Sequence, residues 1–270
     1  MDEFRNKVAV VTGAASGIGF GLARRFASEG MKVVMADVEE PALKSAVDEL
    51  ESDGAEVLGI VTDVSDHDAV QSLATATFDR FGTAHIVCNN AGVGTGGLAW
   101  EVSEPQWRWI VGVNLMGVVH GIQAFVPRLV EQGEGHVVNT ASAAGLMTGP
   151  GMSPYFATKH AVVALSESLA ADLAGVGSGV GVSVLCPQWV KTRIAEADRN
   201  RPPDVEPTVD DSTPDGSAMR EFIRSLVATG MEPSEVADHV VDAIRSNRFY
   251  ILTHPGTVEA VRERFARIEG

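Results

Sequence analysis

Three residues in the middle of the chain have the types and spacing needed to move a proton. Tyr155 and Lys159 stand four residues apart, and Ser142 lies thirteen residues before the tyrosine. Ser153 and Pro154 predict a helix start just before the pair, with the serine as N-cap and the proline at the first helical position. Side chains four apart share a face of a helix, so the phenol and the ammonium should lie side by side. A nearby cation lowers the pKa of a tyrosine, which lets the phenol act as acid or base near neutral pH.

The elements that would position these residues alternate regularly. Short β-branched runs and helical stretches follow one another along the whole chain, which predicts one domain, residues 1–270, with a doubly wound parallel sheet of about seven strands and helices on both faces. Strands are expected at 7–12, 32–37, 56–61, 85–89, 135–141, 180–186 and 249–252. Helices are expected at 17–28, 41–51, 67–81, 104–130, 154–173, 232–245 and 258–268.

One polar segment, residues 188–216, interrupts this alternation. It contains four prolines, Pro202, Pro203, Pro207 and Pro214. A long irregular segment in a compact domain is usually a lid or a disordered stretch. Residues 218–226 then predict a short amphipathic helix. We therefore expect a substrate lid at about residues 188–230.

The charge balance argues against two classes of partner. The chain has 36 acidic and 21 basic side chains and a formal net charge of -15. Nucleic acids and anionic membranes would both require a basic face. We find no signal-peptide region and no stretch near the eighteen or so apolar residues of a membrane helix. Cys88 and Cys186 indicate no disulfide framework, and the histidines lack metal-ligand spacing, so we expect a cytoplasmic protein without a metal.

The first predicted strand runs directly into a glycine-rich turn and a helix start. Residues 13–19 read Gly-Ala-Ala-Ser-Gly-Ile-Gly. Glycines let the backbone approach a pyrophosphate, and a helix N-terminus offers free N–H groups and the positive end of its dipole. Such a cluster can also be a tight turn with close helix packing. Its position between a buried strand and a helix favours a dinucleotide site.

Asp37 ends the second predicted strand, eighteen residues beyond Gly19. A carboxylate at this place can accept hydrogen bonds from both hydroxyls of the adenosine ribose, and its charge repels a 2′-phosphate. No arginine or lysine stands beside it in residues 35–40, Met-Ala-Asp-Val-Glu-Glu. The other interpretation is a solvated turn residue. We expect NAD as the cofactor rather than NADP.

In this order, the Thr12–Gly19 run, the Asn-Asn-Ala-Gly run at 89–92, Ser142 and the Tyr155–Lys159 pair resemble a classical short-chain dehydrogenase/reductase over about residues 5–252. The resemblance implies a Rossmann-type fold and an NAD(P)-dependent enzyme that interconverts an alcohol and its ketone by hydride transfer. The catalytic residues that it implies are Asn114, Ser142, Tyr155 and Lys159. The cofactor-binding residues that we expect are Gly13, Ser16, Gly17, Ile18, Gly19, Asp37, Asp63, Val64, Asn90, Ala91, Gly92, Tyr155, Lys159, Pro187, Val190 and Thr192.

The resemblance also implies a role for each catalytic residue. Tyr155 would be the base in oxidation and the acid in reduction, with its pKa lowered by Lys159, the nicotinamide and the helix N-terminus. Lys159 would also hold the nicotinamide ribose, and Ser142 would bind the substrate oxygen. Asn114 would hold a water that links Lys159 to solvent, although it could equally be a helix-interior asparagine bonded to nearby backbone.

The chain departs from the family pattern after the sixth predicted strand. The family has Pro-Gly there, whereas this chain has Gln188 after Pro187. Thr192 remains placed to bond the nicotinamide amide. We expect Gln188 to alter the local backbone and the nicotinamide pocket without removing a catalytic group.

Apolar side chains from three loops should form the wall of the substrate pocket. They suit a moderately hydrophobic secondary alcohol or ketone, although several could instead pack the lid against the sheet. The expected wall comprises Leu98, Met147, Met152 and Trp189, with Trp100, Leu146, Met219 and Phe222 near them.

Two other functions are compatible with this fold. One is a non-catalytic nucleotide-binding regulator, which could lose Ser142, Tyr155 and Lys159 freely, yet all three are present. The other is a sugar-nucleotide epimerase or dehydratase, but the part after residue 190 leaves little room for a substrate domain. Family members commonly form tetramers, so we expect a homotetramer. Gly112, Gly117 and Gly121 are small enough for close helix packing between subunits, or against the sheet.

Overall fold

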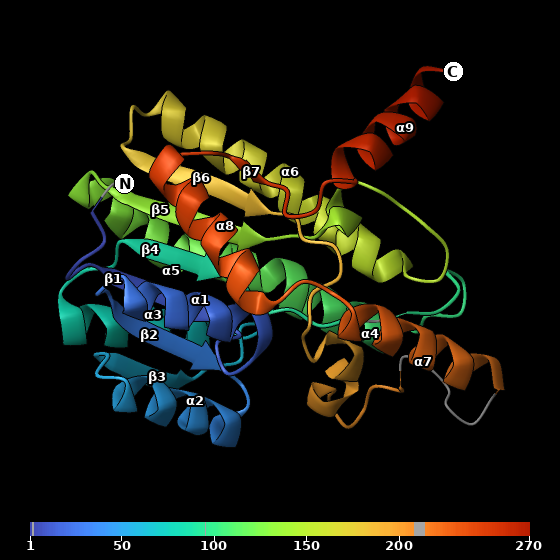
Figure 1. Ribbon diagram of the computed structural model, residues 1–270, viewed down its shortest axis with the longest axis horizontal. Coiled ribbons are helices and arrows are strands. Elements are labelled where there is room, and N and C mark those ends of the chain that lie inside the picture. The colour runs from blue at the N-terminus through green and yellow to red at the C-terminus, as the bar shows by residue number, and fades with distance from the viewer. Residues whose placement is uncertain (2, 95, 208–213) are drawn as a thin grey trace.

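Seven parallel strands form one sheet at the centre of the molecule (Figure 1). The computed structural model describes residues 1, 3–94, 96–207 and 214–270, and for residues 214–217, 219 and 220 only the backbone. The strands are β1 (Val8–Thr12), β2 (Lys32–Asp37), β3 (Val57–Val61), β4 (Ile86–Asn89), β5 (Gly135–Thr140), β6 (Val180–Leu185) and β7 (Tyr250–Ile251). Their order is β3-β2-β1-β4-β5-β6-β7, and all pairings are parallel. The expected single-domain, doubly wound α/β fold is confirmed.

The strand order reverses between β1 and β4. From β1 the chain moves outward to β2 and β3, and after β4 it moves in the opposite direction to β5, β6 and β7. The loops that leave β1 and β4 therefore diverge and open a crevice at the carboxyl ends of the strands. Doubly wound folds bind their ligands at such a switch point.

Helices cover both faces of the sheet. α1, α2 and α8 contribute apolar side chains to one face, and α3, α5 and α6 contribute them to the other. Figure 1 shows α1 and α8 in front of the strands, with α3 and α5 behind them. The helices are α1 (Gly17–Ser28), α2 (Glu40–Ser52), α3 (His67–Phe81), α4 (Glu104–Val111), α5 (Gly117–Gln132), α6 (Ser153–Gly175), α7 (Pro214–Ala228), α8 (Pro233–Ser246) and α9 (Thr257–Glu269).

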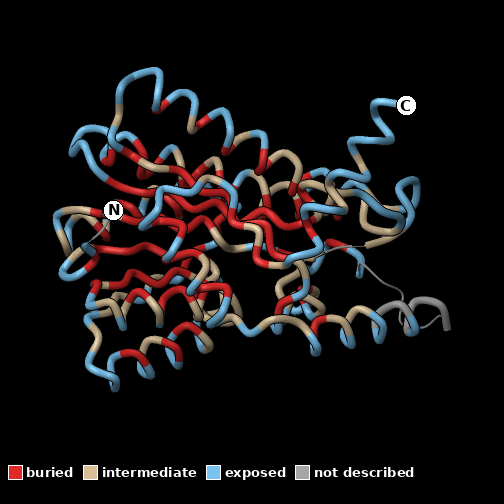
Figure 2. Tube along the Cα trace, turned by 45° about the horizontal axis from the view of Figure 1, so that its top comes forward, coloured by how far each residue is buried: buried red, intermediate tan, exposed pale blue. Residues whose placement is uncertain are grey.

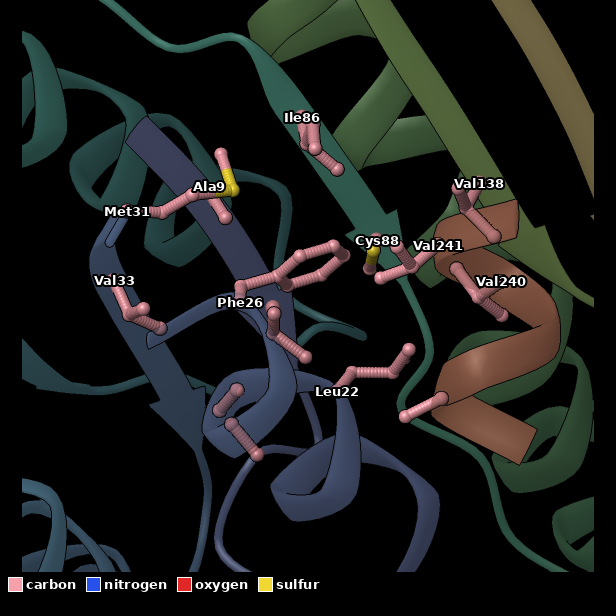
Figure 3. Packing of buried hydrophobic residues seen from close by; sticks show 14 of the residues in the cluster. Ala9, Leu22, Phe26, Met31, Val33, Ile86, Cys88, Val138, Val240 and Val241 are labelled. Carbon is pink, nitrogen blue, oxygen red and sulfur yellow. The ribbon is translucent and has the colours of Figure 1, made fainter. Parts of the chain in front are cut away.

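The two faces of β1 belong to two different hydrophobic clusters. Ala9 belongs to one cluster with Phe26 of α1 and Val240 of α8, and Figure 3 shows these side chains on the same face of the sheet. Val8 and Val10 point the other way, into the cluster under α3, α5 and α6. All five residues of β1 are buried, and Figure 2 shows burial concentrated in the central strands. A strand buried on both faces is typical of a parallel sheet, which explains why its sequence is continuously apolar.

Three expectations about helices are corrected. The expected single helix 104–130 is divided by a π-helical turn, η1 (Gly112–Met116), between α4 and α5. Ser153 is not the N-cap of α6: Met152 occupies that position, and the buried hydroxyl of Ser153 has no hydrogen-bond partner. The segment 188–216 is not wholly irregular, because it contains a short 3-10 helix, η3 (Ile194–Asn200), and α7 begins at Pro214. Its residues 208–213 lie outside the described residues.

The continuous helical run Glu104–Gln132 would be long and apolar enough to cross a membrane by length and composition alone. The sequence analysis did not expect such a segment. Half of its most apolar window is buried inside the fold. Its apolarity is therefore accounted for by packing against the sheet.

Gly117 and Gly121, two glycines of the helical run Glu104–Gln132, pack against the core of the same chain. A Cβ on Gly117 would stand 2.8 Å from Val64 Cγ2, and a Cβ on Gly121 would overlap the side-chain amide of Asn89. Asn89 Nδ2 donates to Asn139 Oδ1 over 2.9 Å, and Asn139 Nδ2 donates to Ser166 Oγ over 3.0 Å. Gly121 thus makes room for a buried polar chain that joins β4, β5 and α6.

We predict that Gly121→Ala destabilises the protein by roughly 1–3 kcal/mol or more, because the new methyl group must displace Asn89 and disturb this chain. Urea unfolding followed by circular dichroism measures the change. Gly175→Ala is the matched control: no atom stands within 4 Å of its Cβ position, so the helix should gain up to about 1 kcal/mol. Equal stability of the two variants would contradict the packing described here.

Candidate active site

A cleft of about 720 Å³ runs along the carboxyl ends of the strands. It lies at the switch point, between the loop after β1 and the loops after β4, β5 and β6. The glycine-rich loop lines one part, and Ser142, Tyr155 and Lys159 line another. The same cleft therefore joins the expected dinucleotide site to the expected catalytic residues.

Two glycines give the loop after β1 its shape. Gly13 and Gly17 have φ angles of 64° and 55°, which side-chain-bearing residues rarely adopt. A Cβ on Gly13 would stand 2.8 Å from Ala91 Cα, and one on Gly17 would stand 2.9 Å from Thr192 Cγ2. Gly19 does not line the cleft; a Cβ there would overlap the carbonyl oxygen of Gly13. The loop is thus a backbone-walled cradle at the start of α1, which suits a pyrophosphate.

The carboxylate of Asp37 stands at the end of β2 and is held by two backbone groups. Its Oδ2 accepts from Ala15 N over 2.9 Å, and its Oδ1 accepts from Glu39 N over 3.0 Å. Each oxygen keeps acceptor capacity for a further donor. Asp63 and Val64, after β3, line the same end of the cleft. These positions fit an adenosine group.

Side chains of η3 close over this end of the cleft by binding Glu39. Arg199 Nε donates to the Glu39 carboxylate over 2.7 Å, Asn200 Nδ2 over 3.0 Å, and Arg193 Nη1 over 3.3 Å. Partial burial alone would raise the pKa of Glu39, but the hydrogen bonds from Asn200 and Arg199 hold it below its ordinary value. Two arginines therefore lie close to Asp37 in space although none is close in sequence, and both pair with Glu39.

Ser142, Tyr155 and Lys159 come together where β5 meets the start of α6. The side chains of Tyr155 and Ser142 interact, and this interaction lowers the pKa of the phenol. The Ser142 hydroxyl donates to the carbonyl oxygen of Pro187 over 3.3 Å. Ser142 Oγ also accepts from Ala144 N over 3.1 Å. Lys159 Nζ donates to the carbonyl oxygen of Thr140 over 2.9 Å and stands 5.7 Å from the centre of the Tyr155 ring. A phenol, a hydroxyl and an amine thus surround one corner of the cleft.

Burial dominates the titration of this corner. It raises the pKa of the Tyr155 phenol, and the interaction with Ser142 opposes that rise only in part. Burial also lowers the pKa of Lys159 to about 8. The expectation that Lys159 lowers the pKa of Tyr155 is not met by the protein's own residues, because desolvation is the larger effect and the amine points to the Thr140 carbonyl.

Asn114 is fully buried in η1 and does not line the cleft. Its Oδ1 accepts from Val93 N over 2.8 Å, and its Nδ2 donates to Val93 O over 2.9 Å. The interpretation as an asparagine bonded to nearby backbone therefore describes its contacts. A Cβ on Gly92 would stand 3.4 Å from Asn114 Oδ1 and 3.5 Å from Lys159 Nζ, so Gly92 keeps the space between the two side chains open.

The remaining expected cofactor residues line the cleft. They are Ser16, Ile18, Asn90, Ala91, Gly92, Pro187, Val190 and Thr192.

The apolar wall differs in part from the expected one. Met147, Met152 and Trp189 line the cleft, but Leu98 does not. Leu98 lies in a turn, where its carbonyl accepts hydrogen bonds from Glu101 N and Val102 N. The residue is 42% exposed. Trp100 and Leu146 also lie outside the lining, and the side chain of Met219 lies outside the described residues. Trp109 and Phe156 line the cleft unexpectedly, and Ile223 and Leu226 of the expected lid helix line it too.

We predict that Lys159→Met stabilises the protein by roughly 1–3 kcal/mol at pH 7, because it removes a buried cation. The lowered pKa means that the folded state disfavours the ammonium. Burying Lys159 therefore costs the wild type the most stability below about pH 8, and this cost falls as the pH rises toward the ordinary lysine pKa of 10.5. Urea unfolding at pH 7, 8, 9 and 10 should show the advantage of the variant shrinking.

Lys44→Met is the control for this series. The hydrogen bond with Asp48 raises the pKa of the exposed Lys44, so its removal should give no advantage that shrinks over this pH range. A constant stability difference between Lys159→Met and the wild type from pH 7 to 10 would contradict the burial argument.

Comparison with known proteins gives one consistent family. A family model described as short chain dehydrogenase matches residues 7–203. The CLA biosynthesis dehydrogenase/reductase of Lactiplantibacillus plantarum is 34% identical over 271 residues, which cover 99% of this chain and 95% of that protein. The 1-deoxy-11-beta-hydroxypentalenate dehydrogenase of Streptomyces arenae is 40% identical over 266 residues, which cover 97% of this chain and 87% of that protein.

Solved structures agree with the sequence comparisons. The crystal structure of a short chain dehydrogenase/reductase from Burkholderia phymatum in complex with NAD has a TM-score of 0.96 and 48% sequence identity. The match covers 100% of this chain and 96% of that chain. The chain therefore belongs to the classical short-chain dehydrogenase/reductase family, and it is an oxidoreductase of the alcohol dehydrogenase/ketoreductase type.

Proposed function

We propose that the protein is an NAD-dependent oxidoreductase that interconverts a moderately hydrophobic secondary alcohol and its ketone, with Tyr155 as the acid or base. One observation carries the proposal. Tyr155 and Ser142 interact with each other and line the same cleft as the glycine cradle and Asp37. A reacting carbon held at the first pair would therefore lie in the same space as a dinucleotide held at the second.

The residues present fit a nicotinamide dinucleotide. The glycine loop lines the cleft at the start of α1, where free backbone N–H groups suit a pyrophosphate. The carboxylate of Asp37 is fixed by Ala15 N and Glu39 N and can receive ribose hydroxyls. Thr192 lines the cleft beside Gly17 and would bond the nicotinamide amide. When bound, the nicotinamide would accept or supply the hydride, and its positive oxidised ring would favour the phenolate of Tyr155.

Proton handling belongs to the protein's own side chains. In alcohol oxidation, Tyr155 takes the hydroxyl proton of the substrate, and Ser142 donates a hydrogen bond to the substrate oxygen. Lys159 follows Tyr155 by one turn of α6, and its amine is held by the Thr140 carbonyl. From there it would bind the nicotinamide ribose and pass a proton toward Tyr155. Asn114 fixes the backbone of Val93 opposite them and, through the space left by Gly92, would hold a water on the way to solvent.

The lining of the cleft supports an apolar substrate. Met147, Met152 and Trp189 approach the catalytic corner, and Phe222 of α7 adds an aromatic edge from the lid. The charged lining residues Arg193 and Arg199 instead pair with Glu39 near Asp37. We infer that residues 188–230 act as the substrate lid. From charge and family resemblance we also infer a cytoplasmic homotetramer.

We predict that Tyr155→Phe lowers turnover by at least about 100-fold, because it removes the group that transfers the proton. A panel of secondary alcohols with NAD, followed at the nicotinamide absorbance, measures turnover. The Kd for NAD, from fluorescence titration, should change little. Normal turnover by this variant would refute the role of Tyr155, and a strict preference of the wild type for small charged alcohols would refute the substrate class.

We predict that the wild type prefers NAD over NADP by about 10- to 1000-fold in kcat/KM, because two like charges some 4 Å apart repel by roughly 1–4 kcal/mol. Asp37→Ser should reduce that preference. Adding Glu39→Gln should reduce it further, because Arg193 and Arg199 are then free to meet a 2′-phosphate. Glu40→Ser, an exposed neighbour outside the cleft, should leave the preference unchanged. Equal use of both cofactors by the wild type would refute the assignment.

A further inference from the structure

Three hydrogen bonds join the loop after β6 to the chain segment after β7. The loop carries Gln188, where the family pattern has glycine, and Trp189, which forms part of the cleft wall. The segment runs from residue 253 to 257 and leads into α9, which projects from the body of the molecule in Figure 1. Because β6 and β7 are paired neighbours, both stretches leave the sheet at the same edge.

The side chain of Gln188 makes the first of these bonds. Its Nε2 donates to Thr257 Oγ1 over 3.0 Å. Thr257 is fully buried and is the first residue of α9. A glycine at position 188 could not make this bond. The departure from the family pattern therefore couples the cleft wall to the C-terminal helix.

The ring of His254 makes the other two bonds. Gln188 N donates to His254 Nδ1 over 3.3 Å, and His254 Nε2 stands 3.2 Å from the carbonyl oxygen of Trp189. Since a backbone N–H can only donate, Nδ1 must be the acceptor, and Nε2 must carry the proton that reaches Trp189 O. Both bonds together require the neutral imidazole with its proton on Nε2. A second proton, on Nδ1, would face the N–H of Gln188 and break the contact.

The surroundings of His254 favour this neutral form. Burial lowers its pKa below the ordinary value, and the bond to the Trp189 carbonyl opposes that shift. Two titratable groups of α8 act in opposite directions: His239 lowers the pKa and Glu235 raises it. Thr253 Oγ1, 2.8 Å from Nδ1, can donate to the same neutral ring. The ring would therefore gain its second proton only under mildly acidic conditions.

Packing alone does not hold Trp189 in place. A second hollow of about 380 Å³ lies beside it, lined by His254, Leu226 and Met231 among others. Trp189 thus borders two open spaces, and its side chain is 37% exposed. Its backbone is tied at Met231, whose N–H donates to Trp189 O over 3.0 Å, and at His254. The hydrogen bonds from Met231 and His254 therefore help to determine where this wall stands.

We propose that Gln188 and His254 are positioning residues, which hold the Trp189 wall of the substrate pocket through the segment between β7 and α9. The proposal rests on the proposed function for its effect on substrates. A loosened wall would weaken the binding of bulky alcohols more than that of the dinucleotide, because the glycine cradle after β1 and Asp37 after β2 belong to other segments of the chain. Because the contact needs neutral His254, the wall would loosen when the pH falls below the pKa of this ring.

Steady-state kinetics with a bulky and a small secondary alcohol, cyclohexanol and 2-propanol, tests the proposal. Gln188→Met and His254→Phe should raise KM for cyclohexanol by about tenfold, the usual effect of one lost hydrogen bond, with a smaller change in KM for 2-propanol. The Kd for NAD should change less than about twofold, because the cradle is untouched. In the wild type, KM for cyclohexanol should rise as the pH falls from 7 to 5, and His254→Phe should lose this dependence.

Two further variants separate positioning from a general loss of structure. His254→Gln keeps a neutral donor that can reach the Trp189 carbonyl, so it should recover much of the wild-type KM and lose the acid dependence. His239→Gln, which removes the neighbouring ring on α8 without touching the loop, should keep the wild-type KM at pH 7 and move the acid dependence to higher pH, because His239 lowers the pKa of His254. Unchanged KM values and pH profiles in both Gln188→Met and His254→Phe would overturn the proposal.

Hydrogen exchange of the peptide that spans residues 186–191 gives a readout that does not need activity. Gln188→Met and His254→Phe should increase exchange there. In the wild type, lowering the pH should increase the exchange of this peptide relative to the intrinsic amide exchange rate at the same pH. If these shifts occur while the wild type oxidises no alcohol, the proposed function fails and the positioning stands. If exchange is unchanged in an active enzyme, the positioning fails and the proposed function stands.

Discussion

The side chain of Asn90 ties together the three central strands at the edge where the cleft opens. Its Nδ2 donates to the carbonyl oxygen of Thr12 at the end of β1 over 2.9 Å, and its Oδ1 accepts from Thr140 Oγ1 at the end of β5 over 3.2 Å. The carbonyl of Thr140 in turn accepts a hydrogen bond from Lys159 Nζ. One amide on β4 thereby sets the distance between the glycine cradle and the catalytic corner. A parallel sheet allows this, because the carboxyl ends of neighbouring strands meet at one edge.

The position of the catalytic corner has an electrostatic cost. Lys159 is buried and Tyr155 is partly buried, and desolvation moves both pKa values away from the charged forms. The chain offers Lys159 a backbone carbonyl rather than a carboxylate, so its charge is solvated only in part. A strong counter-charge would have held the proton on the lysine permanently. A dipolar partner leaves its pKa near 8, within reach of proton exchange at moderate pH.

The sequence was sufficient for those features that depend on local periodicity and on glycine. All seven strands occur at the expected places, because each contains a short apolar or β-branched run between turn residues; β1, β4 and β5 are buried throughout, and β3 and β7 lie at the edges of the sheet. Gly13 and Gly17 could be recognised because their conformations exclude most other residues. Ser153 misled the helix-start prediction: serine and proline before a periodic stretch are a good cap signal, yet Met152 occupies the cap and Ser153 lies inside the helix. The π-helical turn around Asn114 has no local signal of its own, since its residues suit an ordinary helix equally well.

The other missed features are long-range pairings that no local pattern announces. Glu39 and Arg199 are separated by 160 positions, and Gln188 and Thr257 by 69. Neither pair has a spacing rule, because their meeting depends on how η3 and the segment after β7 fold back over the edge of the sheet. The family pattern marked Gln188 as unusual, but only the structure gave its side chain a partner. We therefore propose that substrate preference in this protein is decided where prediction from sequence is weakest, in contacts between the loops that cover the edge of the sheet. In this proposal, a lid held at one end by Glu39 and a wall held at the other by His254 distinguish this enzyme at the rim of its cleft.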